Sequence, residues 1–166
     1  MEVATMVNMG MIKTGKAPDK LSTVLGSCIG LTLYDRVKKV GMLAHIMLPE
    51  SNEGNKETEN FETAGKFADV ALKNMLKQLS IQRMELKNLE AKIVGGSKMF
   101  EIKRKNEICN IGKRNEEAVK KILNDNHIKI AAEDTGGNIG RKITFSLETG
   151  KVEVSFTLNK SLNKII

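Results

Sequence analysis

The fold is decided by the stretch VLGSCIGLTLYDRVKKVGMLAHIML, residues 24–48. It contains two short runs rich in Val, Ile, Leu and Thr, residues 24–34 and 40–48, and such runs are typical of β-strands. The polar residues 35–39 between them predict a hairpin, and Pro49 ends the second strand. We therefore expect these two strands to be neighbours in a sheet.

The rest of the chain alternates between helical and strand patterns. Apolar residues at helical spacing over 61–79, with lysines between them, predict an amphipathic helix that covers a sheet. A second helix is predicted after Asn110, whose side chain can cap it. Residues 50–60 are polar and predict a loop. The remaining predictions are strands at 89–94 and 128–132, a tight turn at 136–140, and a final hairpin of 142–147 with 151–158.

Strands that occur both in hairpins and between helices predict an α/β protein of the α+β type, with mixed β-sheet layers and helices packed on the outside. The length of 166 residues is close to that of one ordinary domain. We therefore expect a single domain that spans residues 1–166.

Charge and hydropathy restrict the class of partner. The net charge is +7, but the densest basic stretch, 103–105, lies between Glu101 and Glu107. With one Tyr and no Trp, the chain has few aromatic rings for base stacking, so we predict no nucleic-acid partner. No run of about eighteen apolar residues is present, which predicts no membrane insertion. Two cysteines without an export signal predict reduced thiols and a cytoplasmic location.

The strongest candidate for chemistry is Cys28, which stands between Gly26 and Gly30 where a strand begins. Glycines allow a sharp turn and a close approach of substrate, so the backbone at Gly26 and Ser27 is a candidate oxyanion site. The alternative is that Cys28 is a small buried apolar residue, which is the usual role of a free cysteine.

The hairpin brings a histidine towards this cysteine. If the turn pairs Asp35 with Lys38, Cys28 lies directly opposite His45, and the Cβ atoms of opposed residues are roughly 4.5–5.5 Å apart. A change of register by one residue would place them on opposite faces. The imidazole is then expected to form an ion pair with the thiolate, and this pair is the active nucleophile. The alternative for His45 is a buried histidine with a purely structural role.

A hydroxyl is expected to hold the imidazole in one orientation. Ser22 and Thr23 are the nearest candidates along the chain, and spacing does not choose between them. A zinc site is not predicted, because Cys28, His45, Cys109 and His127 lack the closely spaced pairs of structural zinc sites.

Five pieces of the chain, in this order, resemble the CheD family of chemoreceptor glutamine deamidases. They are residues 25–28, 44–49, 91–100, 110–115 and 133–138. The resemblance implies a cysteine hydrolase fold shared with some deamidating toxins. It also implies a protein-glutamine deamidase that acts on the cytoplasmic helices of chemoreceptors in chemotaxis adaptation.

Carried over by position, the resemblance implies Cys28 as the nucleophile and His45 as the base. Ser22 stands where the family has its third catalytic residue, a threonine, and Thr23 is the alternative. The family pairs with a CheC-type phosphatase, for which Met99 and Phe100 are the candidate docking residues. No cofactor is implied. Two other functions remain open: a non-catalytic regulator of that phosphatase, and another thiol acyl-transferase such as a transglutaminase or protease.

Overall fold

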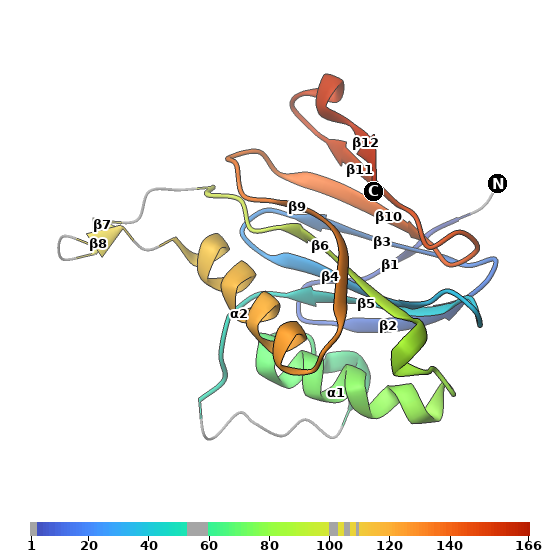
Figure 1. Ribbon diagram of the computed structural model, residues 1–166. Helices are drawn as coiled ribbons and strands as arrows, with labels where there is room; N and C mark the ends of the chain where they lie inside the picture. The colour runs from blue at the N-terminus through green and yellow to red at the C-terminus, as the bar shows by residue number, and fades with distance from the viewer. Residues whose placement is uncertain (1–2, 53–59, 100–102, 105–106, 109) are drawn as a thin grey trace.

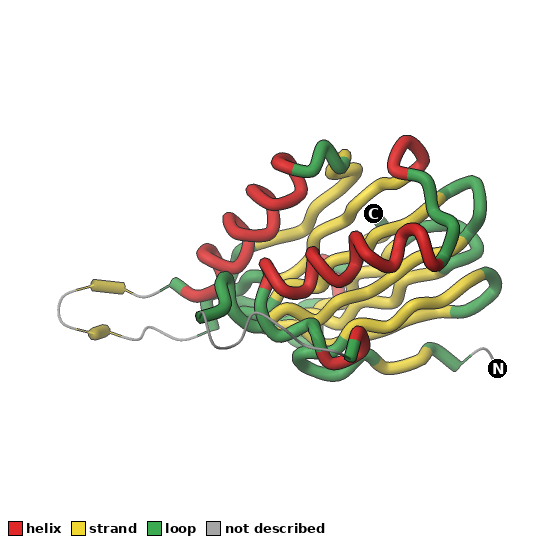
Figure 2. Tube along the Cα trace, turned by 90° about the horizontal axis from the view of Figure 1, so that it is seen from below, coloured by secondary structure: helices red, strands yellow, loops and turns green. Residues whose placement is uncertain are grey.

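The computed structural model describes residues 3–52, 60–99, 103–104, 107–108 and 110–166. Within these ranges the chain forms three layers, in which two β-sheets face each other and two α-helices cover the far side of one sheet (Figure 1). Figure 2, seen from the helical side, shows both helices lying across this sheet. The predicted class, mixed sheet layers with helices on the outside, is confirmed, and the likeness to the toxin fold stays a prediction.

We name the sheet next to the helices the central sheet and the other one the outer sheet. In spatial order the central sheet contains β2 (Ile12–Lys16), β5 (Val40–Ile46), β4 (Ile29–Asp35), β6 (Leu89–Gly95) and β9 (Lys129–Thr135). The outer sheet contains β1 (Thr5–Met6), β3 (Lys20–Leu25), β10 (Arg141–Ser146), β11 (Val152–Phe156) and β12 (Lys164–Ile165). The other elements are β7 (Lys103–Arg104), β8 (Glu107–Ile108), α1 (Ala68–Ile81), α2 (Ile111–Asp125) and short 3-10 helices at Phe61–Thr63, Leu86–Asn88 and Lys160–Leu162.

Two apolar cores separate the three layers, and β5 contributes to both. Successive side chains of a strand point to opposite faces of its sheet. Met42, Ala44 and Ile46 belong to the core between the central sheet and the helices. Leu43 belongs to the core between the two sheets. His45 has the same parity as Leu43, so its ring lies between the sheets.

Both predicted helices are present. The first begins later than expected, at Ala68, because the residues before it form a separate 3-10 helix capped by the side chain of Asn60. The prediction for α2 is confirmed, since the Asn110 side chain accepts a hydrogen bond of 3.0 Å from the amide of Lys113. Among the helices in the described ranges, none combines the length and the apolar character that a membrane crossing requires.

The run 24–34 is not one strand, as the sequence suggested, but parts of two. β3 ends at Leu25 in the outer sheet and β4 begins at Ile29 in the central sheet. The bend at 26–28 therefore carries the chain from one sheet to the other. The final hairpin, β10 with β11, is confirmed.

The β4–β5 hairpin is confirmed, but its predicted register is wrong by two residues. Asp35 pairs with Val40 rather than with Lys38, which leaves a loop of residues 36–39. The Asp35 carboxylate accepts hydrogen bonds of 3.0 Å from the amides of Val37 and Lys38, and Lys39 has a φ of 53°. These contacts hold a loop longer than the tight turn that was expected.

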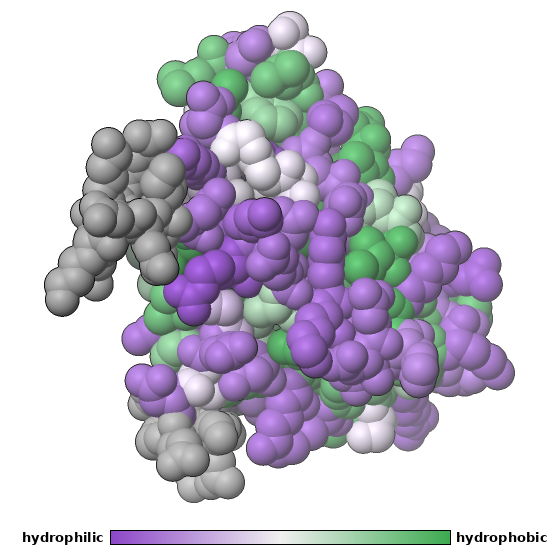
Figure 3. Space-filling view, turned by 60° about the vertical axis from the view of Figure 1, so that its left-hand side comes forward, coloured by the Kyte–Doolittle hydropathy of each residue, from purple (hydrophilic) through white to green (hydrophobic). Residues whose placement is uncertain are grey.

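Polar side chains cover most of the face drawn in Figure 3, and hydrophobic ones are interspersed among them. The lysines that the sequence places between the apolar positions of α1, such as Lys73 and Lys77, are exposed. This distribution matches a basic surface that is solvated.

Candidate active site

His45 lies near the end of β5, between the two sheets, and is only 3% exposed. Its Nδ1 atom is 2.7 Å from the hydroxyl oxygen of Thr23, which comes from β3 in the facing sheet. The two candidate residues are therefore joined across the interior by a direct hydrogen bond.

The hydrogen bonds around Thr23 determine which nitrogen of His45 carries the proton. The Thr23 hydroxyl is also 2.7 Å from the carbonyl oxygen of Val7, an atom that can only accept. Because the hydroxyl has one proton and donates it to Val7, the Nδ1–H of His45 must donate to Thr23. In the neutral ring the lone pair is then on Nε2, which is buried without a hydrogen-bond partner among the described residues. In the neutral imidazole, Nε2 is therefore the nitrogen that can accept a proton.

Ser22, the other hydroxyl candidate, has its side chain on the opposite face of β3. Alternation places Thr23 on the same face as Leu21 and Leu25, both members of the core between the sheets. Ser22 is also buried, and its carbonyl oxygen accepts a backbone hydrogen bond from Val7. Of the two candidates, the structure brings Thr23 into contact with His45.

Cys28 lies in the bend just before β4. Gly30 is the residue directly opposite His45, so Cys28 is two positions further along the ladder than predicted. A register shift of two residues leaves each side chain on the same face of the sheet. Cys28 accordingly packs at the edge of the core that His45 faces. A Cβ at Gly30 would come within 2.8 Å of Leu25, so glycine is needed there for the sheets to approach. The thiol and the imidazole therefore face the same core between the two sheets.

The three carbonyl groups of the bend all accept hydrogen bonds. The amide of Ser97 donates to Gly26 O at 2.9 Å, and the amide of Gly96 donates to Cys28 O at 2.9 Å. The side-chain NH₂ of Asn115 donates to the remaining carbonyl, Ser27 O, at 3.1 Å. The backbone that carries Cys28, including the predicted oxyanion turn, is thus held by the segment that follows β6 and by α2.

Gly95 makes the close approach of β6 to the bend possible. Its φ is +112°, and a Cβ would lie 2.2 Å from the carbonyl oxygen of Cys28. No residue with a side chain fits this position without displacing the bend.

Burial changes the acid–base properties of both groups. Desolvation raises the pKa of the Cys28 thiol above its ordinary value of 9.0. Desolvation also lowers the pKa of His45 below 6.5, and a backbone contact with Val7 offsets this shift only in part. Both directions favour a neutral thiol beside a neutral imidazole, and they disfavour the ion pair that the sequence suggested.

The pKa direction of His45 leads to a prediction for activity. A proton acceptor at Nε2 is lost when the ring is protonated, so kcat/KM should fall on the acid side with a midpoint below pH 6.5, the ordinary histidine pKa. The check is kcat/KM measured from about pH 4.5 to about pH 8 at constant ionic strength, with unfolding followed in the same buffers. An acid limb with its midpoint above pH 6.5 would contradict the buried, neutral ring.

The predicted docking residues lie close to the bend as far as they are described. Met99 is 41% exposed, and its Cγ atom would be 3.1 Å from a Cβ at Gly26. Phe100 lies outside the described residues, as does most of the predicted loop 50–60. Residues 136–140, predicted as a tight turn, form a bend that leads from β9 in the central sheet to β10 in the outer sheet, and Gly136 and Gly137 both have positive φ.

Two groups that form hydrogen bonds in the candidate site were not predicted from the sequence. The Val7 carbonyl gave no signal, because any residue type can supply a backbone oxygen. Asn115 gave a signal that was not used: it is a polar residue on the buried face of α2, in line with Gly112, Val119 and Leu123. A polar side chain in such a stripe is expected to have specific hydrogen-bond partners.

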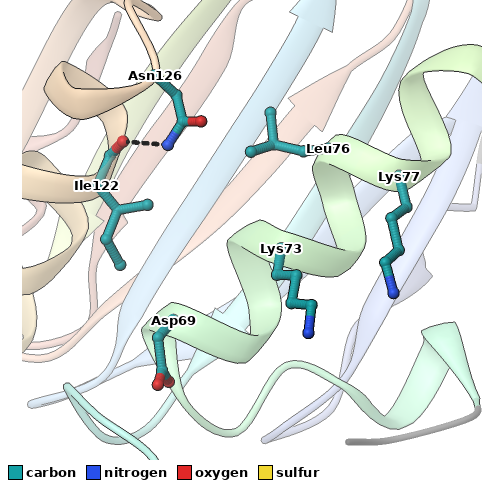
Figure 4. Close-up of a pocket in the computed structure, with 6 residues that line it drawn as sticks. All are labelled: Asp69, Lys73, Leu76, Lys77, Ile122 and Asn126. Atoms are coloured by element: carbon teal, nitrogen blue, oxygen red, sulfur yellow. Dashed lines mark hydrogen bonds between the residues drawn. The ribbon is translucent and has the colours of Figure 1, made fainter. Parts of the chain in front are cut away.

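A cavity of about 530 Å³ lies elsewhere, between the two helices (Figure 4). Leu76 and Ile122 supply its apolar surface, and Lys73 and Lys77 extend from α1 beside them. Cys28, His45 and Thr23 are not among the residues that line it, so this cavity is not the candidate site.

A cysteine that faces the same interior as a histidine, whose Nδ1 is held by a hydroxyl, is typical of thiol-dependent acyl-transfer enzymes as a class. Comparison with known proteins identifies the group within that class. The family sequence model described as "CheD chemotactic sensory transduction" matches residues 47–156. The chain belongs to the CheD family.

Curated relatives agree with this assignment. A protein of Clostridium novyi (strain NT), named "Probable chemoreceptor glutamine deamidase CheD", is 49% identical over 138 residues, which cover 82% of this chain and 83% of the relative. A protein of the same name from Syntrophomonas wolfei subsp. wolfei is 45% identical over 149 residues, covering 89% of this chain and 90% of the relative. The one from Clostridium kluyveri is 43% identical over the same length and shares of the two chains.

Proposed function

We propose that this chain is a chemoreceptor glutamine deamidase, a protein-glutamine glutaminase that converts glutamine side chains of chemoreceptors to glutamate in chemotaxis. The observation that carries the proposal is the chain of two 2.7 Å hydrogen bonds from Val7 O through Thr23 to His45 Nδ1. It leaves Nε2 as a proton acceptor on the side of the sheet that Cys28 also faces. The names of the relatives supply the substrate.

In the first half of the reaction, His45 Nε2 takes the proton of the Cys28 thiol as the sulfur attacks the carboxamide carbon of glutamine. A C–S bond forms, and the carbonyl π electrons move to oxygen. When the tetrahedral intermediate collapses, the C–N bond breaks and Nε2 returns the proton to the departing nitrogen. Ammonia leaves, and the glutamyl group remains as a thioester of Cys28.

In the second half, water takes the place of the thiol. Nε2 accepts a proton from water as the oxygen attacks the thioester, and collapse of this intermediate breaks the C–S bond. The proton on Nε2 returns to sulfur, so the neutral pair of the resting state is restored. One water is consumed, one ammonia is released, and glutamate remains.

The proposal is tested by incubating the full chain with the cytoplasmic domain of a chemoreceptor. The expected result is release of ammonia and a gain of about one mass unit at individual glutamines. Intact receptor mass with no ammonia would refute it. Incorporation of an added primary amine would indicate a transglutaminase, backbone cleavage would indicate a protease, and an effect on a CheC-type phosphatase without deamidation would indicate a regulator.

Thr23, rather than Ser22, is proposed as the residue that orients His45. Thr23→Val keeps the shape but removes the hydroxyl, and a buried donor left without its partner costs about 1–3 kcal/mol, so kcat should fall about 10-fold to 100-fold. Thr23→Ser should restore most of this loss. Ser22→Ala is the matched control and should stay within about threefold, because the Ser22 side chain lies on the face of β3 opposite to the one that meets His45. The measurement is steady-state kcat and KM for each variant. A larger loss of kcat in Ser22→Ala than in Thr23→Val would reverse the assignment.

The remaining expectations concern partner, location and organisation. We propose a CheC-type phosphatase as partner, with Met99 as the described part of its docking surface, because a protein that covered Met99 would lie against the Gly26 bend. We propose a cytoplasmic location, since the proposed substrate is the cytoplasmic region of chemoreceptors. We also propose that residues 1–166 act as one domain, because both sheets contribute to the candidate site.

A further inference from the structure

The direction of the peptide group between Ser27 and Cys28 is fixed by one side chain. Its carbonyl oxygen, Ser27 O, accepts a hydrogen bond of 3.1 Å from Asn115 Nδ2. In a planar trans peptide the C=O and N–H bonds point in opposite directions. The Cys28 N–H is therefore directed away from the Asn115 side chain, and the Cys28 side chain packs against the core between the sheets.

The neighbouring carbonyls reinforce this orientation. Gly26 O and Cys28 O accept backbone amides of Ser97 and Gly96, so the bend is anchored on both sides of the Ser27–Cys28 peptide. Among the hydrogen bonds of the described residues, none uses the Cys28 N–H as a donor. An amide held next to a nucleophile and free to donate is what an oxyanion site requires.

Asn115 also ties the bend to the strand that carries His45. The same NH₂ group donates to Met47 O at 3.0 Å, just past the end of β5. Asn115 is fully buried in α2, and the amino end of that helix is seated against β6, where Gly96 and Gly112 are in backbone contact. Figure 1 shows this end of α2 beside the end of β6, at the left of the sheets. Asn115 thus links the bend that carries Cys28 to the end of the strand that carries His45.

We propose that Asn115 is a positioning residue that holds the Cys28 N–H in place as an oxyanion donor. This inference rests on the proposed acyl transfer at Cys28. Its effect should appear only in reactions that develop negative charge on a carbonyl oxygen, because alkylation or thiolation of sulfur that involves no carbonyl does not use the donor.

Two thiol reagents, used without any receptor, distinguish reactions that develop charge on a carbonyl oxygen from reactions that do not. Methyl methanethiosulfonate thiolates a cysteine directly and contains no carbonyl. A capped glutamine analogue, in which the side-chain NH₂ is replaced by CH₂Cl, presents a ketone oxygen where the carboxamide oxygen would lie. Attack by Cys28 forms the C–S bond and expels chloride. In Asn115→Ala, labelling by the chloroketone should be at least about tenfold slower, since loss of one oxyanion donor costs about 100-fold to 1,000-fold. Labelling by the thiosulfonate should change by less than about threefold.

Asn74→Ala is the matched control. The Asn74 side chain donates to Val70 O at 2.8 Å within α1 and has no bond to the bend, so both rates should equal those of the unmodified chain. If Asn115→Ala does not fold, Asn115→Ser is used, because a hydroxyl keeps one donor and cannot bridge Ser27 O and Met47 O. Equal slowing of both reagents would show a general loss of structure at the bend and overturn the proposal, as would no slowing of either.

The design keeps the two proposals apart. A chain that leaves receptors unmodified but shows the selective loss with the chloroketone refutes the proposed function and supports the role of Asn115. A chain that deamidates receptors but shows no selective loss refutes the role of Asn115 alone. For an active chain, deamidation by Asn115→Ala should show the loss in kcat with KM nearly unchanged.

Discussion

Replacement of Cys28 by alanine is expected to lower the rate of deamidation by a factor of about 10⁴ or more, because the proposed thioester forms on the Cys28 sulfur. The fold should survive the change. Cys28 is half-buried at the edge of the core between the sheets, and losing one sulfur atom there should shift the unfolding temperature by no more than about 4 °C.

The chain contains a matched control for this variant in its second cysteine. Cys109→Ala removes a thiol as well, and it should leave ammonia release unchanged. Cys28→Ser is the conservative variant and should also be nearly inactive, because a serine hydroxyl is a far weaker nucleophile beside a neutral imidazole. Ammonia release and receptor mass are measured for all three. Deamidation retained by Cys28→Ala would refute the mechanism.

The elements of this fold could be predicted wherever a local pattern decides them. The β4–β5 hairpin, α1, α2 and the last hairpin each follow from the spacing of apolar residues. The strands before residue 25 were missed, and so was the division of 24–34 into two strands. That division depends on which sheet each half joins, a property of contacts distant in sequence. The local signal for it was the pair Gly26–Ser27, where a bend was expected.

The register of the β4–β5 hairpin shows why a site cannot be placed from strand pattern alone. Asp35 accepts the amides of two loop residues and Lys39 takes a left-handed φ, so the loop is two residues longer than the assumed turn. An error of two residues preserves the face of the strand. The expectation that Cys28 and His45 face the same interior therefore holds, whereas the expectation that they are directly opposed does not.

The orienting hydroxyl illustrates a finer limit. Ser22 and Thr23 are adjacent and both buried, so composition and burial cannot separate them. The alternation of β3 separates them once its sheet is known, because only one of its faces meets the core between the sheets. The family resemblance favoured Ser22 by position, and the hydrogen bond to His45 is made by Thr23.

The second large effect is expected for His45→Gln, and its pH dependence distinguishes a neutral pair from an ion pair. Burial raises the Cys28 pKa above 9.0, so less than about 1% of the thiol is ionised at pH 7 once the base is removed. Ammonia also departs without its acid, and kcat should fall about 10³-fold or more. Because the variant depends on thiolate already formed, its rate should rise about tenfold per pH unit from about pH 7 to about pH 9, where the unmodified chain is flat.

The control for His45→Gln is His127→Asn, which changes the other histidine of the chain. His127 is exposed at the end of α2 with a φ of 56°, a conformation that asparagine also accepts. Its activity and pH profile should match those of the unmodified chain. A His45→Gln rate that is low but independent of pH would mean that the thiolate forms without His45, as in an ion pair with another cation. Because His45 Nε2 is buried without a hydrogen-bond partner among the described residues, we expect the steep profile instead.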